Sequence, residues 1–107
     1  MHRGQKTMAK TKVFISQPMR GLSPEYLSAV RSAAISEIRN RMGEDVEIIE
    51  NIKDLGEGRS PVWYLGKAIQ QMSEADLAYF CPGWDQYKGC SIEHRICLNY
   101  GIEIMRD

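Results

Sequence analysis

Short apolar runs alternate with helical patterns along this sequence. Runs rich in β-branched and aromatic residues predict strands at Lys12 to Ser16, Val46 to Glu50, Leu77 to Cys81 and Ile102 to Met105. A helical pattern fills each gap between consecutive strands, and strands joined by a helical crossover pair in parallel. The alternation therefore predicts an α/β fold in which helices cover a parallel sheet of about four strands.

Capping signals set the limits of the three expected helices. The first two begin with a serine N-cap followed by proline, and glycine ends the first and the third. These signals are Ser23-Pro24 and Gly43 for the first helix, Ser60-Pro61 for the second, and Gly89 to Gly101 for the third. Helical spacing predicts the buried faces of the first two helices: Leu27, Val30, Ala34, Ile38 and Met42, then Val62, Leu65, Ile69 and Met72.

Length and composition predict one domain, because a chain of 107 residues that is 43% hydrophobic has material for one core. Basic residues gather at the start, so we expect a disordered basic tail over residues 1–11 and a single domain over residues 12–107. The formal net charge is zero, which favours neither nucleic acid nor an anionic membrane as partner. The sequence contains neither an apolar run of ~20 residues nor a signal-peptide pattern, so we expect a cytoplasmic protein.

The cysteines are expected to be buried free thiols. Cys81, Cys90 and Cys97 are odd in number and form no CxxC pair, and the last two would lie two helical turns apart, too far for a disulfide. The phosphate-loop motif GxxxxGK[ST] and the dinucleotide motif GxGxxG do not occur. We therefore expect neither a metal ion nor a cofactor.

Three loops open on the carboxyl edge of the predicted sheet: Gln17 to Leu22, Asn51 to Arg59 and Pro82 to Lys88. Open α/β folds bind their ligands at this edge. Arg20 beside Gly21 can offer guanidinium and backbone donors to a phosphate; the alternative is a solvated arginine in a turn.

Aromatic residues lie in or beside two of these loops. Trp84 and Tyr87, on an exposed loop, can stack on a nucleobase. Trp63 and Tyr64, at the start of a helix, can do the same; the alternative is that they fill the core.

Glu93 falls in the apolar stripe of the last helix. On a 3.6-residue period its neighbours are Gly89, Cys90, Ile96 and Cys97, and a carboxylate is seldom buried without a reason. One explanation is that Glu93 complements the positive end of the helix dipole. The other is that it faces a ligand cleft at the carboxyl edge of the sheet.

Three segments of the chain resemble the nucleoside 2-deoxyribosyltransferase-like superfamily, and within it the small bacterial and phage-encoded proteins grouped as a domain of unknown function. They are F-I-S-Q-P-M-R-G at 14–21, A-D-L-A-Y-F-C-P-G-W at 75–84 and G-C-S-I-E at 89–93. The resemblance implies a flavodoxin-like three-layer sandwich that forms a homodimer or a higher homo-oligomer. It also implies cleavage or exchange of the N-glycosidic bond of a nucleoside or its 5′-monophosphate. The superfamily's glutamate nucleophile matches Glu93, a few residues after Gly89.

Other superfamily positions are changed in this chain. Ala68 occupies the place of the catalytic aspartate, Phe14 that of a tyrosine, and Tyr87 that of a serine or aspartate six residues before the nucleophile. Arg20 and Gly21 match the phosphate-side loop. A general acid for the leaving base is still needed, and the sequence leaves the replacement open among Tyr64, Asp85 and Tyr87.

We therefore expect a protein that binds a small nucleoside or nucleotide and uses Glu93 as nucleophile in N-glycosidase or deoxyribosyltransferase chemistry. The residues expected to line its site are Ser16, Gln17, Met19, Arg20, Gly21, Gly83, Trp84, Tyr87 and Gly89. One alternative is a non-catalytic binder that sequesters a nucleotide-derived signal, as a phage-type sponge or anti-defence protein would. Another is a structural or protein-binding domain in which Glu93 only complements a helix end.

Overall fold

The computed structural model describes residues 10–50 and 58–105. Helices and strands alternate along the chain: β1 Thr11–Ser16, α2 Pro24–Met42, β2 Val46–Ile48, α3 Pro61–Met72, β3 Leu77–Phe80, η1 Trp84–Gln86, α4 Lys88–Tyr100 and β4 Glu103–Ile104. The four strands pair in parallel in the order β2-β1-β3-β4. The predicted α/β fold with a four-stranded parallel sheet is confirmed, and the strand order is that of the flavodoxin-like folds.

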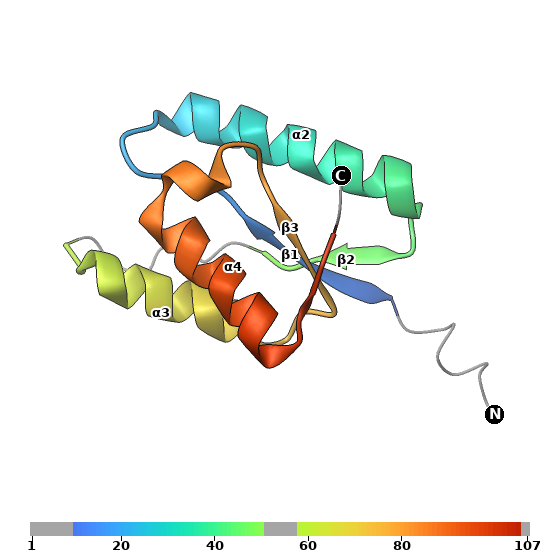
Figure 1. Cartoon of the computed structure of the whole chain (residues 1–107). Coiled ribbons are helices and arrows are strands. Elements are labelled where there is room, and N and C mark those ends of the chain that lie inside the picture. The colour runs from blue at the N-terminus through green and yellow to red at the C-terminus, as the bar shows by residue number, and fades with distance from the viewer. Residues whose placement is uncertain (1–9, 51–57, 106–107) are drawn as a thin grey trace.

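The sheet lies between two helical layers, with α2 on one face and α3 and α4 on the other (Figure 1). Side chains of β1 point alternately to the two faces, as in any strand. Val13 and Ile15 pack in one core cluster with Ile38 of α2, whereas Phe14 packs in another with Met72 of α3 and Cys97 of α4. Since β1 supplies both cores, it is the strand on which the three layers are assembled.

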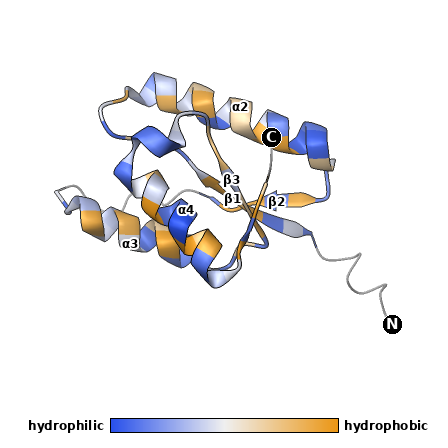
Figure 2. Ribbon diagram, in the orientation of Figure 1, coloured by the Kyte–Doolittle hydropathy of each residue, from blue (hydrophilic) through white to orange (hydrophobic). Residues whose placement is uncertain are grey.

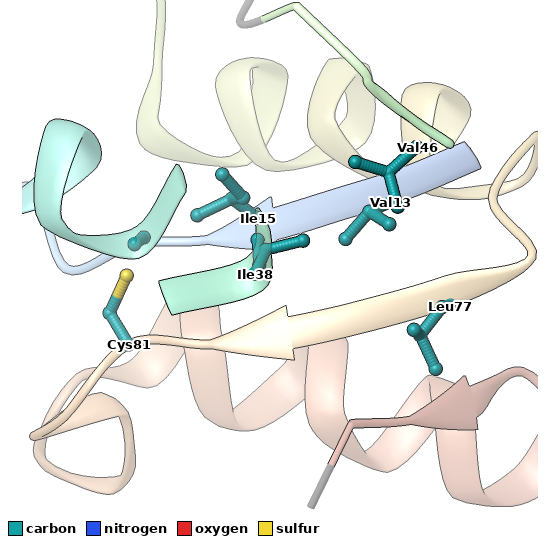
Figure 3. Close-up of a cluster of buried hydrophobic side chains, with 7 residues drawn as sticks. Val13, Ile15, Ile38, Val46, Leu77 and Cys81 are labelled. Carbon is teal, nitrogen blue, oxygen red and sulfur yellow. The ribbon is translucent and has the colours of Figure 1, made fainter. Parts of the chain in front are cut away.

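The core beneath α2 is built from three strands and one helix. Ile38 lies among side chains of β1, β2 and β3, together with Cys81 at the end of β3 (Figure 3). The helices alternate hydrophobic and hydrophilic segments along their length (Figure 2), as expected for helices that pack one face on a sheet. Burial of large side chains such as Ile38, which has no exposed surface, contributes about 1.5–3 kcal/mol each to stability.

The predicted capping signals act as expected. The Ser23 hydroxyl accepts a hydrogen bond from the backbone N–H of Tyr26, and the Ser60 hydroxyl accepts one from that of Trp63, each at 3.1 Å. Such serine caps are each worth about 1 kcal/mol. Gly101 ends α4 in the left-handed conformation, with φ of 77°, and its N–H bonds to Cys97 O.

The predicted strand limits differ from the observed ones by one or two residues. β1 begins at Thr11 rather than Lys12, while β2, β3 and β4 are shorter than expected. The prediction that Val62 is buried is wrong, because its side chain is 75% exposed. Val62 lies in the first turn of α3, which projects beyond the ends of the strands (Figure 1).

Some expectations fall on residues outside the described ranges. These are the tail over residues 1–9 and most of the predicted loop from Asn51 to Arg59, of which the structure describes Gly58 and Arg59. Within the described ranges, the helices lack the combination of length and apolar character that a membrane crossing requires.

Candidate functional site

The site lies where β1 and β3 end side by side. Ser16, the last residue of β1, is in register with Phe80, the last residue of β3, and the backbone N–H of Cys81 bonds to Ser16 O at 3.0 Å. From this point one loop leads to α2 and another to α4. The carboxyl edge of a parallel sheet is the usual place for a ligand in an open α/β fold.

Glu93 is buried at this edge, as its helical position predicts. Its side chain is 6% exposed, and Oε1 accepts a hydrogen bond from the Ser16 hydroxyl at 2.5 Å. Glu93 lies five residues beyond Lys88, where α4 begins, and the helix-dipole effect fades within the first turn. The dipole explanation therefore accounts for little of why a carboxylate is here.

The carboxyl of Glu93 is harder to ionise than an ordinary glutamate. Burial raises its pKa, and the hydrogen bond from Ser16 acts in the opposite direction. Among the described residues, no lysine, arginine or histidine forms an ion pair with it. A buried carboxylate without a cation nearby is costly to the fold, and groups of this kind concentrate at functional sites.

The three cysteines are free and buried, as predicted. Burial is the largest cause that raises the pKa of each thiol to about 11. Near neutral pH the thiols are therefore protonated, and Cys90 and Cys97, which lie on either side of Glu93 along α4, act as small apolar neighbours. Within the described parts of the chain, His, Cys, Asp and Glu side chains form no metal-binding cluster.

The structure brings Ser16 to Glu93 and takes Gln17 to the other face of the sheet. Gln17 Nε2 donates to Leu27 O of α2 at 2.7 Å. Its Oε1 is buried and accepts no hydrogen bond from any described residue. The bond to Leu27 thus satisfies the amide nitrogen of Gln17, whereas its buried oxygen is left without a partner among the described residues.

Met19, Arg20 and Gly21 form an exposed turn after β1. The N–H of Leu22 bonds to Met19 O at 3.3 Å, and Gly21 adopts φ of 78°, which favours glycine. Arg20 is exposed and forms no ion pair with the described residues. Its guanidinium is thus available to an anion at the carboxyl edge.

The loop from β3 to α4 begins with a tight turn and continues through η1. Gly83 has φ of 86°, and the N–H of Trp84 bonds to Cys81 O at 3.1 Å. Tyr87 is half-buried at the N-cap of α4, and Gly89 follows within the first turn. These residues place the start of α4 close to the end of β3.

The Trp84 side chain packs against two other rings. Its indole stacks on the His94 imidazole, with ring centroids 4.0 Å apart and 11° between the planes, and Phe80 packs against both rings. The imidazole therefore covers one face of the indole, and a nucleobase would have to stack on the opposite face. This cluster was not predicted from the sequence, because its members come from a loop, a strand and the polar side of a helix.

Trp63 is part of a second aromatic group that also has basic neighbours. Arg59 lies 4.7 Å and Lys67 5.4 Å from the ring centroid, and Tyr64 packs edge-on at 5.2 Å. Arg59 and Lys67 were not predicted as site residues. Lys67 follows Trp63 by four residues within α3, a helical spacing that could have found it, whereas Arg59 precedes the helix and its approach to Trp63 depends on the path of the chain before Ser60.

Two shallow depressions lie on the outer side of α4, away from Glu93. One is lined by Ser91, Ile92, Arg95, Ile96 and Asn99, and the other by Trp84, Ser91, His94, Arg95, Leu98 and Asn99. Glu93 lines neither depression, so its buried carboxylate is placed at the carboxyl edge of the sheet.

The positions that the resemblance assigns to two catalytic partners lie in the core. Phe14 is buried, and Ala68 packs against the same cluster with Met72 and Cys97. Neither side chain can transfer a proton. The proposed replacements are found at the surface or near it: Asp85 is exposed in η1, Tyr87 is half-buried and Tyr64 is 40% exposed.

Comparisons with curated proteins and with solved structures give no match for this chain. A comparison with known protein families matches residues 11–106, from the first residue of β1 to beyond β4. Because this match includes both ends of the sheet and the Ser16 and Glu93 pair, the chain belongs to the family described as Domain of unknown function (DUF4406).

Proposed function

We propose that this protein binds a nucleoside or nucleotide at the carboxyl edge of β1 and β3 and cleaves or transfers its N-glycosidic bond, with Glu93 as the nucleophile. The observation that carries the proposal is the buried carboxylate of Glu93, held by Ser16 and without a cation among its described neighbours. Such a group complements the positive charge that develops at an anomeric carbon.

The reaction has two steps. In the first, an oxygen of the ionised Glu93 carboxylate bonds to the anomeric carbon while the bond to the base nitrogen breaks, and the electron pair leaves with the base, which takes a proton from a general acid or from water. In the second, water or another base attacks the anomeric carbon and frees the carboxylate. If water attacks, it gives up a proton and the product is the free sugar or sugar phosphate.

The resemblance to the nucleoside 2-deoxyribosyltransferase-like superfamily supports this chemistry. The matched segments include both members of the pair, Ser16 and Glu93. The exposed Arg20, in the turn with Gly21, supports a ligand with a 5′-phosphate. No cofactor takes part in the proposed reaction.

A non-catalytic binder of the same ligand class is the second candidate. It is favoured by Phe14 and Ala68, which pack in the core at positions where the superfamily has a tyrosine and an aspartate. A protein that kept the pocket and lost its proton donor would hold the ligand intact and could sequester a nucleotide-derived signal.

The decisive comparison uses the wild type and Glu93→Gln, which keeps the shape and an acceptor for Ser16. Both are incubated with deoxynucleosides, 5′-monophosphates and ADP-ribose-type nucleotides; chromatography follows the free base, and thermal shift follows binding. Base release by the wild type that is lost in Glu93→Gln supports the enzyme. A thermal shift with an intact ligand supports the binder. If no ligand shifts the melting temperature, both candidates are contradicted.

A homodimer or higher homo-oligomer in the cytoplasm is part of the proposal. Three large side chains of α4 are exposed, namely Ile92 at 44%, Leu98 at 63% and Tyr100 at 79%, and self-association would remove them from water. The three free thiols fit a reducing compartment. Analytical ultracentrifugation tests the assembly, and sedimentation as a single monomeric species would contradict it.

A further inference from the structure

Ser16, Cys90 and Glu93 form a closed cluster at the end of β1. Their exposed fractions are 1%, 4% and 6%. Cys90 precedes Glu93 by three residues on α4, so the two side chains lie on one face of the helix, about one turn apart. Ser16 comes from β1 and donates to Glu93 Oε1. No other described residue donates a hydrogen bond to this carboxylate.

The Ser16 hydroxyl has one proton to give, and two acidic groups lie beside it. Burial is the largest cause that raises the pKa of Cys90 and of Glu93, and the Ser16 hydroxyl opposes that rise in both. One proton cannot serve both groups at once. The bond of 2.5 Å shows that Glu93 receives it, so Cys90 packs beside the pair as a protonated thiol.

The position of Ser16 on β1 holds the donor of this hydrogen bond in a fixed place. The strand lies between β2 and β3, and its last residue is held to β3 by the bond from Cys81 N–H to Ser16 O. The terminal torsion of a glutamate is otherwise broad, so an unsupported carboxylate samples many orientations. A donor on a central strand removes that freedom.

We propose that Ser16 is the positioning residue of Glu93: its hydroxyl holds Oε1 and leaves Oε2 as the oxygen that meets the ligand. The first part concerns the protein alone. The second part, in which Oε2 forms the bond to the anomeric carbon, rests on the function proposed above.

Titration of Glu93 tests the first part without a ligand. In protein labelled at glutamate ¹³Cδ, NMR follows each carboxyl with pH, and the Glu93 signal is the one missing from Glu93→Gln. We expect Ser16→Ala to move the Glu93 midpoint to higher pH, because burial remains while the opposing hydrogen bond is gone. Ser16→Cys, which keeps a weaker donor on a slightly larger side chain, should move it less in the same direction.

Ser91→Ala is the matched control, since Ser91 is a serine of α4 that lines the outer depressions. It should leave the Glu93 midpoint unchanged. A thermal melt of each variant confirms that it is folded at the temperature of the titration. If the midpoint stays at its wild-type value in both Ser16 variants, the positioning role is overturned.

Base release tests the second part. Ser16→Ala should lower kcat by about tenfold, the size expected for one net hydrogen bond, with little change in KM. If Ser16→Ala shifts the Glu93 midpoint but the wild type releases no base, Ser16 positions Glu93 and the role of Oε2 is contradicted. If the wild type releases base but Ser16→Ala does not shift the midpoint, the proposed function stands and the role of Ser16 in it is contradicted.

Discussion

The imidazole of His94 lies parallel to the indole of Trp84, with ring centroids 4.0 Å apart. The pair joins the loop after β3 to the second turn of α4, and Phe80 packs against both rings. His94 therefore holds the loop against the helix that carries Glu93.

Removal of the stacked ring should destabilise the protein. Aromatic pairs contribute about 0.5–1.5 kcal/mol beyond the area they bury, so we expect His94→Ala to lower the free energy of unfolding by at least about 1 kcal/mol in urea. Arg95→Ala, at the exposed neighbouring position, should change it by less than about 0.5 kcal/mol. Equal effects of the two substitutions would show that the stack contributes nothing.

The cysteines should be unreactive in the folded protein. Each thiol is buried and has a pKa raised to about 11, so at pH 8 less than about 1% is thiolate. With Ellman's reagent at pH 8 we expect almost no colour from native protein and three equivalents of thiol in guanidinium chloride. Fast reaction of one native thiol would contradict the burial of that residue.

Glu93→Gln should make the protein more stable at neutral pH. The folded-state pKa of Glu93 is raised, so the native protein binds more protons than the unfolded chain, and wild-type stability falls as pH rises through that pKa. Glutamine cannot ionise and keeps an acceptor for Ser16. Urea unfolding should show a stability gain of the variant at pH 7.5 that shrinks towards pH 4; a variant less stable than wild type at both pH values would contradict it.

Arg20→Ala should weaken binding of a phosphorylated ligand selectively. A charge-assisted hydrogen bond to phosphate is worth about 1.5–3 kcal/mol, so Kd for a 5′-monophosphate should rise by about tenfold or more, while Kd for the matching nucleoside stays the same. Arg39→Ala is the control, because Arg39 lies near the far end of α2. Isothermal titration calorimetry measures both, and equal losses for nucleoside and monophosphate would exclude a phosphate contact.

Features that depend on residues near one another in the sequence were predicted well. The serine and proline signals placed the starts of α2 and α3 correctly, and helical spacing placed Glu93 among buried residues. These predictions depend on neighbours within one or two turns, which the sequence displays directly. Val62 was predicted wrongly because spacing gives the face of a helix but not where the sheet beneath it ends.

Contacts between distant segments could not be predicted in this way. The bond between Ser16 and Glu93 joins residues 77 positions apart, and its formation depends on the register of β1 with β3 and on the rotation of α4. The turn of Gln17 towards Leu27 follows from the alternation of β1, but its partner is set by the packing of α2. Pairing of Trp84 with His94 likewise depends on the path of the loop between β3 and α4.

A covalent intermediate on Glu93 is the most direct test of the proposed nucleophile. Wild-type protein is mixed with a ligand that releases base, quenched in acid and digested, and the peptides are weighed by mass spectrometry. The account predicts a sugar or sugar phosphate attached to the peptide that contains Glu93, and no such adduct in Glu93→Gln. Base released at an undiminished rate by Glu93→Gln, or an adduct on a different residue, would contradict it.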